Sequence, residues 1–193
     1  MKYVELVRKS FGKQSVFSMQ SLRTLLAKKG ISKGYSNLLV HNLLKKGELH
    51  KIAKGIYSFQ SDPMIAGFAF SPFYYGLQEA LSLRNLWEQE TNPIVLTPKK
   101  VRTGTREILG SNVLVRHIGR KMFFGFELIK YYDTWIPVSD PEKTLIDFVY
   151  FNEPLSKEAL QEIKAKISAP KLEQYLKKCG KKTRQKTKKI IQG

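Results

Sequence analysis

Residues 32–59 read SKGYSNLLVHNLLKKGELHKIAKGIYSF, and this stretch decides the fold of the amino-terminal third of the chain. Its first half predicts a helix that begins after Ser32 or Ser36, both good helix caps, and ends at Gly47. Its second half holds two short β-prone runs around Lys54-Gly55. Because glycine there permits the positive φ of a tight turn, we expect a β-hairpin directly after the helix.

The expected helix has two different faces. At about 100° per residue, its apolar side chains gather on one side, and Asn37, His41 and Lys45 recur every four residues on the other. An amide, an imidazole and a cation suit base edges and phosphates in a DNA major groove. Taken alone, the pattern also fits an ordinary amphipathic helix with a solvated polar face.

The segments before and after this helix favour the DNA-binding interpretation. Residues 1–11 have helical spacing of apolar side chains up to Gly12, and a second helix is expected from Ser18 to Gly30. Three short helices followed by a hairpin are typical of a winged helix-turn-helix domain, which we predict for residues 1–60. Lys51 and Lys54 lie on the hairpin, where a phosphate backbone would pass. Winged helices also serve as protein-contact modules, which is the alternative.

The charge is divided unevenly along the 193 residues, whose formal net charge is +18. Residues 1–60 hold 12 Lys/Arg and 2 Asp/Glu, residues 61–150 hold 10 and 10, and residues 151–193 hold 12 and 4. Two basic ends around a neutral middle indicate a polyanionic partner, most often nucleic acid. Solvated lysine-rich faces are the simpler alternative, and a membrane surface comes third.

Several classes of protein are excluded or disfavoured by composition. The single cysteine, Cys179, rules out an intrachain disulfide and a thiolate metal framework, and the three histidines have no close second ligand. The amino-terminus lacks a signal-like apolar core, and the most apolar stretch, residues 64–77, is too short to span a bilayer. We therefore expect a soluble, cytoplasmic protein with no metal, no cofactor and no membrane partner.

The remainder of the chain predicts an α+β fold. Residues 61–152 are expected as a mixed helix and antiparallel-sheet domain, and residues 153–193 as a basic helical C-terminal extension. Within the middle domain we expect helices over 74–89 and 140–150, and strands over 94–97, 113–118, 123–129 and 134–138. Residues 181–189 carry only basic and neutral side chains. That end either contacts phosphates of DNA or RNA, or improves solubility as a solvated segment.

Catalytic motifs are not evident. The chain has no phosphate-cradling glycine loop and no GxSxG sequence. Asp140, Glu142, Lys143 and Asp147 resemble the acidic-plus-lysine set of a metal-dependent nuclease, but Glu142 and Lys143 are adjacent instead of separated by one residue. Helix capping accounts for Asp140, with Ser139 and Glu142 as a competing capping box, and Lys143 with Asp147 forms an i,i+4 pair. We predict no enzymatic activity and keep the nuclease as the enzymatic alternative.

Four motifs in this order resemble the AbiEi-type antitoxins, the transcriptional regulators of abortive-infection toxin–antitoxin systems. The resemblance runs from about Phe17 to Phe151. The motifs are LLxxGxLxxxxxGxY (Leu43 to Tyr57), YxGxxxALSxxxLxEQ (Tyr74 to Gln89), a strand block ending in Phe123-Phe-Gly125, and VSDPEKTLIDFVY (Val138 to Tyr150). Many members have His-Gly where this chain has Arg84-Asn85, a departure that bears on a turn or a partner contact.

The resemblance implies a repressor of its own operon that acts as the antitoxin of a nucleotidyltransferase toxin of the AbiEii type. It assigns contacts with double-stranded operator DNA, made by a monomer or a dimer, to Lys33, Asn37, His41, Lys45, Lys51 and Lys54. It gives no catalytic residues, and leaves an antitoxic role open for Glu142, Lys143 and Asp147. The alternative from another class is an RNA- or ribosome-associated protein that uses both basic ends.

Overall fold

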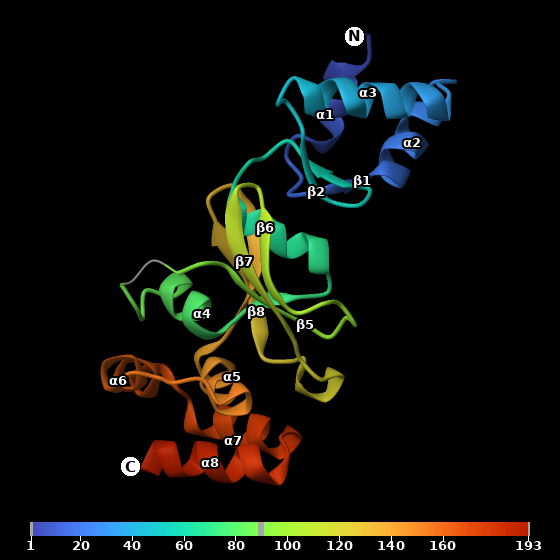
Figure 1. The fold of residues 1–193 in the computed structure, drawn as a ribbon. Coiled ribbons are helices and arrows are strands. Elements are labelled where there is room, and N and C mark those ends of the chain that lie inside the picture. Colours follow the sequence, from blue (N-terminus) through green and yellow to red (C-terminus); the bar gives the residue numbers. More distant parts are fainter. Residues whose placement is uncertain (1, 89–90, 193) are drawn as a thin grey trace.

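The computed structural model describes residues 2–88 and 91–192 and has an α+β fold (Figure 1). Its amino-terminal region contains three helices and three short strands. In chain order these are α1 (Val4–Phe11), β1 (Phe17–Ser18), α2 (Met19–Ala27), α3 (Lys33–Lys45), β2 (His50–Ala53) and β3 (Ile56–Ser58). The side chain of Ser18 accepts a hydrogen bond from Ser21 N, and that of Ser32 from Tyr35 N. Ser32 is therefore the cap of α3, whereas Ser36 is buried inside it.

Strand β1 was not expected from the sequence. Both β1 and β2 pair antiparallel with β3, so that Phe17 and Lys51 lie on either side of Tyr57. The strand brings Phe17 onto Phe11 of α1, with the two rings stacked 4.5 Å apart. Both rings belong to an apolar cluster shared with α2 and α3. This cluster gives the amino-terminal region a core of its own.

The middle region is built on a six-stranded sheet in the described part of the chain. Its elements are η1 (Pro63–Phe70), β4 (Tyr74–Tyr75), α4 (Leu77–Leu83), β5 (Ile94–Thr97), β6 (Gly104–Ile108), β7 (Ser111–His117), η2 (Arg120–Met122), β8 (Phe126–Tyr131) and β9 (Thr134–Ser139). The strand order is β6-β7-β5-β4-β9-β8. The expected antiparallel pairing is found for β4 with β5, β6 with β7 and β8 with β9, but the sheet is mixed, because β5 pairs with β7 and β4 with β9 in parallel. Both parallel pairs join strands separated by a long connection, which parallel pairing requires.

The helix expected over residues 74–89 is much shorter. Tyr74 and Tyr75 form strand β4, which lies between β5 and β9 in the sheet, and both side chains are fully buried. The helix α4 ends at Leu83, and Asn85 then adopts a left-handed conformation with φ of 55°. Gln89, the last residue of the expected helix, lies outside the described residues. Pairing with two distant strands thus overrides the local helical spacing at the tyrosines.

Four helices complete the described chain: α5 (Pro141–Phe151), α6 (Lys157–Lys166), α7 (Ala169–Lys178) and α8 (Lys181–Gln192). Their buried side chains Leu145, Ile163 and Leu172 share an apolar cluster with Tyr74 and Leu96 of the sheet. The segments 61–152 and 153–193 therefore share an apolar cluster, and the middle segment has a second cluster of its own. Figure 1 shows α3 and α8 at opposite ends of the molecule. In the residues described, no helix combines the length and the apolar character needed to cross a bilayer.

Candidate nucleic-acid interface

The helix α3 separates its buried and exposed side chains clearly. Leu39, Val40 and Leu43 are buried against the amino-terminal core. The stripe of side chains expected to contact DNA is exposed along the whole helix: Lys33, Asn37, His41 and Lys45. Because these four residues recur every four positions, they lie on one face of α3, as the sequence predicts. The structure therefore brings four of the six expected contact residues together.

The other two, Lys51 and Lys54, lie on the hairpin of β2 and β3 and are also exposed. Gly55 has φ of 74° in the turn, a conformation that side-chain-bearing residues rarely adopt. The register shifts between Lys51 and Ala53, which marks a bulge in β2. The two lysines thus form a second group on a separate element, next in the chain to α3.

Arg23 of α2 is a residue that the sequence analysis missed. Its guanidinium donates a hydrogen bond of 3.1 Å to Oδ1 of Asn37. This contact uses the amide oxygen of Asn37, and its amino group is a hydrogen-bond donor. The Arg23 Nε is enclosed and has no hydrogen-bond partner within the described residues. The helical spacing of α3 could not reveal this contact, because it joins two helices.

Leu38 is a second residue that the sequence pattern did not single out. It lies beside Asn37 on α3, and 53% of it is exposed to solvent. An apolar side chain in this position can contact the methyl group of thymine, which only the major groove presents. The exposed face of α3 therefore combines hydrogen-bonding, cationic and apolar groups.

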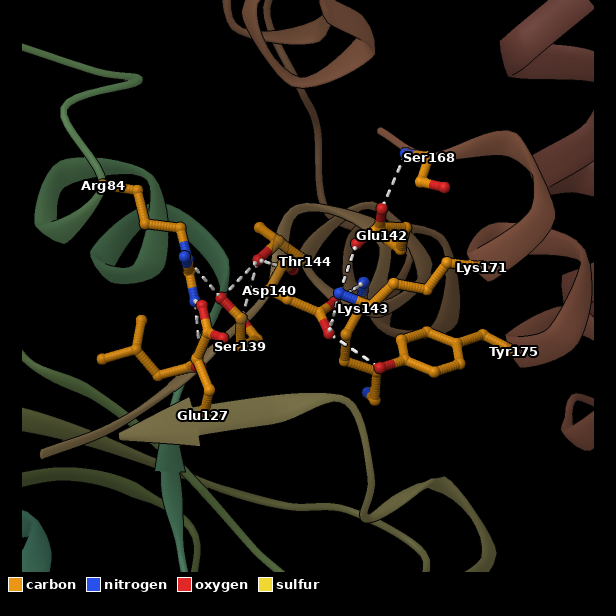
Figure 2. A network of polar contacts seen from close by, with 11 residues as sticks. Arg84, Glu127, Ser139, Asp140, Glu142, Lys143, Thr144, Ser168, Lys171 and Tyr175 are labelled. Carbon is orange, nitrogen blue, oxygen red and sulfur yellow. Dashed lines mark hydrogen bonds and ion pairs between the residues drawn. The ribbon is translucent and has the colours of Figure 1, made fainter. Parts of the chain in front are cut away.

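Three residues of the nuclease alternative lie elsewhere, in a polar network at the start of α5 that reaches α7: Asp140, Glu142 and Lys143 (Figure 2). Asp140 caps α5 by accepting a hydrogen bond from Lys143 N, which decides between the two expected capping registers. Its other oxygen accepts a 2.8 Å hydrogen bond from the Tyr175 hydroxyl and lies 3.1 Å from the Lys171 ammonium. Burial, together with the hydrogen bond to Asp140, raises the pKa of Tyr175 to about 12.

Glu142 extends this network to the start of α7. One carboxylate oxygen accepts a hydrogen bond of 2.7 Å from Ser168 N, and the other lies 3.2 Å from Lys171 Nζ. Burial opposes the charge on Lys171, but Asp140 and Glu142 outweigh it, so that the pKa of Lys171 is raised. The oxygens of Asp140 and Glu142 are thus engaged in holding α7 against α5.

Lys143 and Asp147 form the predicted i,i+4 pair, and both are fully buried. The Tyr74 hydroxyl completes the group, donating to Asp147 at 2.8 Å and accepting from Lys143 at 2.8 Å. Burial raises the pKa of Asp147, while the Lys143 charge acts in the opposite direction. In the residues described, no three His, Cys, Asp or Glu side chains gather closely enough to hold a metal ion.

Arg84, where the chain departs from the AbiEi-type motif, also has a defined place. It follows α4 and donates a 2.7 Å hydrogen bond to the Ser139 carbonyl, just before α5 (Figure 2). Its guanidinium lies 2.9 Å from Glu127 of β8. Arg84 therefore connects the end of α4 to the sheet through non-covalent contacts.

Comparison with known proteins shows that the fold of this chain is similar to that of a solved structure. No protein-family model and no curated protein matches the sequence. Among solved structures, the chain is similar to the RV2827C protein from Mycobacterium tuberculosis, with a TM-score of 0.62 and 16% sequence identity. The alignment covers 100% of this chain and 77% of the mycobacterial chain. At this identity the similarity describes the architecture and carries no activity.

Proposed function

We propose that this protein is a sequence-specific DNA-binding transcriptional repressor. The observation that carries the proposal is the single exposed face of α3, which presents Lys33, Asn37, His41 and Lys45 side by side. The supporting context is the chain order of helix, strand, two helices and two antiparallel strands, which is typical of a winged helix. On this proposal α3 enters the major groove and the β2–β3 hairpin is the wing.

The roles of the side chains follow from their chemistry. The Asn37 amino group and the His41 ring are the groups suited to base edges, and Leu38 is suited to a thymine methyl group. The lysines Lys33 and Lys45 at the two ends of α3 contact phosphates, which fix the register of the helix without reading sequence. Lys51 and Lys54 on the wing have the same positioning role.

We also propose that the repressor is the antitoxin of a toxin–antitoxin operon, with a nucleotidyltransferase toxin of the AbiEii type as its functional partner. This part rests on the four AbiEi-like motifs. Co-expression with the neighbouring gene is the direct test. Growth restored by the wild-type protein supports the antitoxin role, and growth arrest despite normal levels of the protein contradicts it.

The test of DNA binding is a titration of the protein with its own upstream DNA and with a scrambled duplex, over a series of salt concentrations. We expect a complex that prefers the upstream DNA and weakens as salt rises. Alanine at Lys33, Asn37, His41 and Lys45 together should abolish the preference. The control is Lys99→Ala/Lys100→Ala, two exposed lysines after β5, which should bind like wild type.

The same titration separates the alternatives. Equal binding of both duplexes, unaffected by the quadruple substitution, contradicts the proposed reading face. Preference for structured RNA over duplex DNA at equal salt favours the RNA-associated protein instead. Magnesium-dependent cleavage that is lost in Asp140→Ala would favour the nuclease.

A further inference from the structure

A groove of about 600 Å³ lies at the opposite end of the protein from α3, between α5, α6, α8 and the segment 152–155. Its walls are mainly apolar and come from Val149, Leu155, Leu160 and Ile190. These four side chains are only partly buried, whereas the residues of the apolar cluster that α5–α8 share with the sheet are buried. The groove has the size and the apolar lining of a site for a small molecule.

The mouth of the groove is positively charged. Lys186 and Lys189 reach it from adjacent turns of α8, and both are exposed. Lys186 donates a hydrogen bond to the neutral side-chain oxygen of Asn152, at 3.2 Å. The one carboxylate in the lining, Glu153, is neutralised by Arg116 at 2.5 Å. Two ammonium groups therefore stand beside an apolar groove without a matching negative charge in its lining.

We propose that this groove binds an anionic amphiphile, a small molecule with an apolar chain and a carboxylate or phosphate head group. The chain lies between Val149, Leu155, Leu160 and Ile190, where it replaces water against apolar side chains. The head group lies at Lys186 and Lys189, because two ammonium groups on one side of a helix bind an anion through charge-assisted hydrogen bonds. Neither the apolar lining nor the lysine pair is used by the proposed DNA interface.

The probe for this proposal is decanoate, titrated below its micelle concentration and followed by calorimetry. We expect saturable binding of one decanoate per chain, no binding of acetate, and clearly weaker binding of decyltrimethylammonium. A carboxylate and a phosphate head are distinguished by comparing decanoate with decyl phosphate. Leu160→Trp should weaken binding because the larger ring occupies part of the groove, and its thermal unfolding shows whether the variant folds.

Charge is tested by a matched pair of variants on α8. Lys186→Gln/Lys189→Gln should weaken decanoate binding roughly tenfold, as expected for lost charge-assisted contacts. Lys181→Gln/Lys182→Gln removes the same charge from exposed positions of the same helix that do not line the groove, and should bind like wild type. Both variants replace exposed side chains, so that they test the proposal even if Leu160→Trp does not fold.

Three outcomes would overturn the proposal. Equal weakening in both lysine variants would mean that the basic surface attracts decanoate without a site. Unchanged binding in a folded Leu160→Trp would place the molecule elsewhere. Absence of decanoate binding, together with a dimer that Leu160→Trp dissociates, would make the groove an interface between two copies of this chain.

Discussion

The Lys143 side chain is fully buried, and its ammonium group contacts the Asp147 carboxylate and the Tyr74 hydroxyl. Removing one member of a buried ion pair leaves an uncompensated charge, which costs about 3–5 kcal/mol. Lys143→Met should therefore lower the free energy of unfolding by about that amount. Urea unfolding, followed by far-ultraviolet circular dichroism, measures the change.

The control is Lys143→Met/Asp147→Leu, which removes both charges and should recover most of the lost stability. The pH dependence gives a second check. Burial is the largest influence on the pKa of Asp147 and raises it above its ordinary value of 3.8, so without the opposing charge of Lys143 the folded state binds the proton more tightly than the unfolded state. The stability of Lys143→Met should then fall as pH rises between 3.8 and the raised pKa, and equal losses at low and high pH would contradict this account.

These residues also show which contacts of single side chains can be predicted from one sequence. The Asp140 cap and the Lys143–Asp147 spacing could be predicted, because both depend on neighbours within one helix. The complete burial of the pair could not, because it depends on Tyr74 in a distant strand and on α7. Arg23 was missed for the same reason, since its partner Asn37 lies on another helix.

At the scale of elements, Arg184 helps to hold α8 against α7, together with the ion pair of 2.7 Å between Lys188 and Glu173. Arg184 donates hydrogen bonds to the carbonyl oxygens of Leu176, Lys177 and Cys179 at the end of α7. Cys179 is the only cysteine of the chain and is buried beneath this contact, and burial raises the pKa of its thiol. Arg184→Ala should loosen α8 and increase the rate at which a disulfide reagent modifies Cys179, by roughly tenfold.

Lys182→Ala, an exposed neighbour on α8, is the control and should leave the rate unchanged. An Arg184→Ala protein whose thiol reacts as slowly as wild type would show that the remaining contacts, the Lys188–Glu173 ion pair and the apolar packing, are enough to hold the helix. The basic residues 181–189, part of the expected helical extension over residues 153–193, lie in this helix. Most residues of α8 are lysines and other polar residues, so its sequence shows little apolar periodicity. The apolar cluster against which it packs is formed by other elements of the chain.

Elements with clear caps or local patterns were predicted better than elements that depend on distant partners. The positions of α2, α3, α5 and β5 follow from caps and local patterns, which act within a few residues. The two-residue strand β1 and the edge strand β6 exist because of partners elsewhere in the chain. The parallel pairing of β4 with β9 is likewise a property of the whole sheet, which local periodicity does not encode.

At the scale of the whole molecule, the sequence shows two basic ends and the structure shows where they lie. The basic face of α3 and the lysines of α8 are at opposite ends of the protein (Figure 1). A straight duplex bound along α3 is therefore expected to pass far from α8. On the proposed function, the positive charge of α8 contributes nothing to operator affinity, although it is a large part of the net charge.

The salt dependence of operator binding tests this arrangement. Each phosphate contact contributes roughly 0.9 to the slope of log affinity against log salt concentration. Lys33→Gln/Lys45→Gln should therefore reduce the magnitude of the slope by about 2, because both lysines are expected on phosphates. Lys181→Gln/Lys182→Gln removes equal charge from α8 and should leave the slope at the wild-type value. If the α8 variant reduced the slope as much as the α3 variant, DNA would have to contact both ends, by bending around the protein or by binding as two segments.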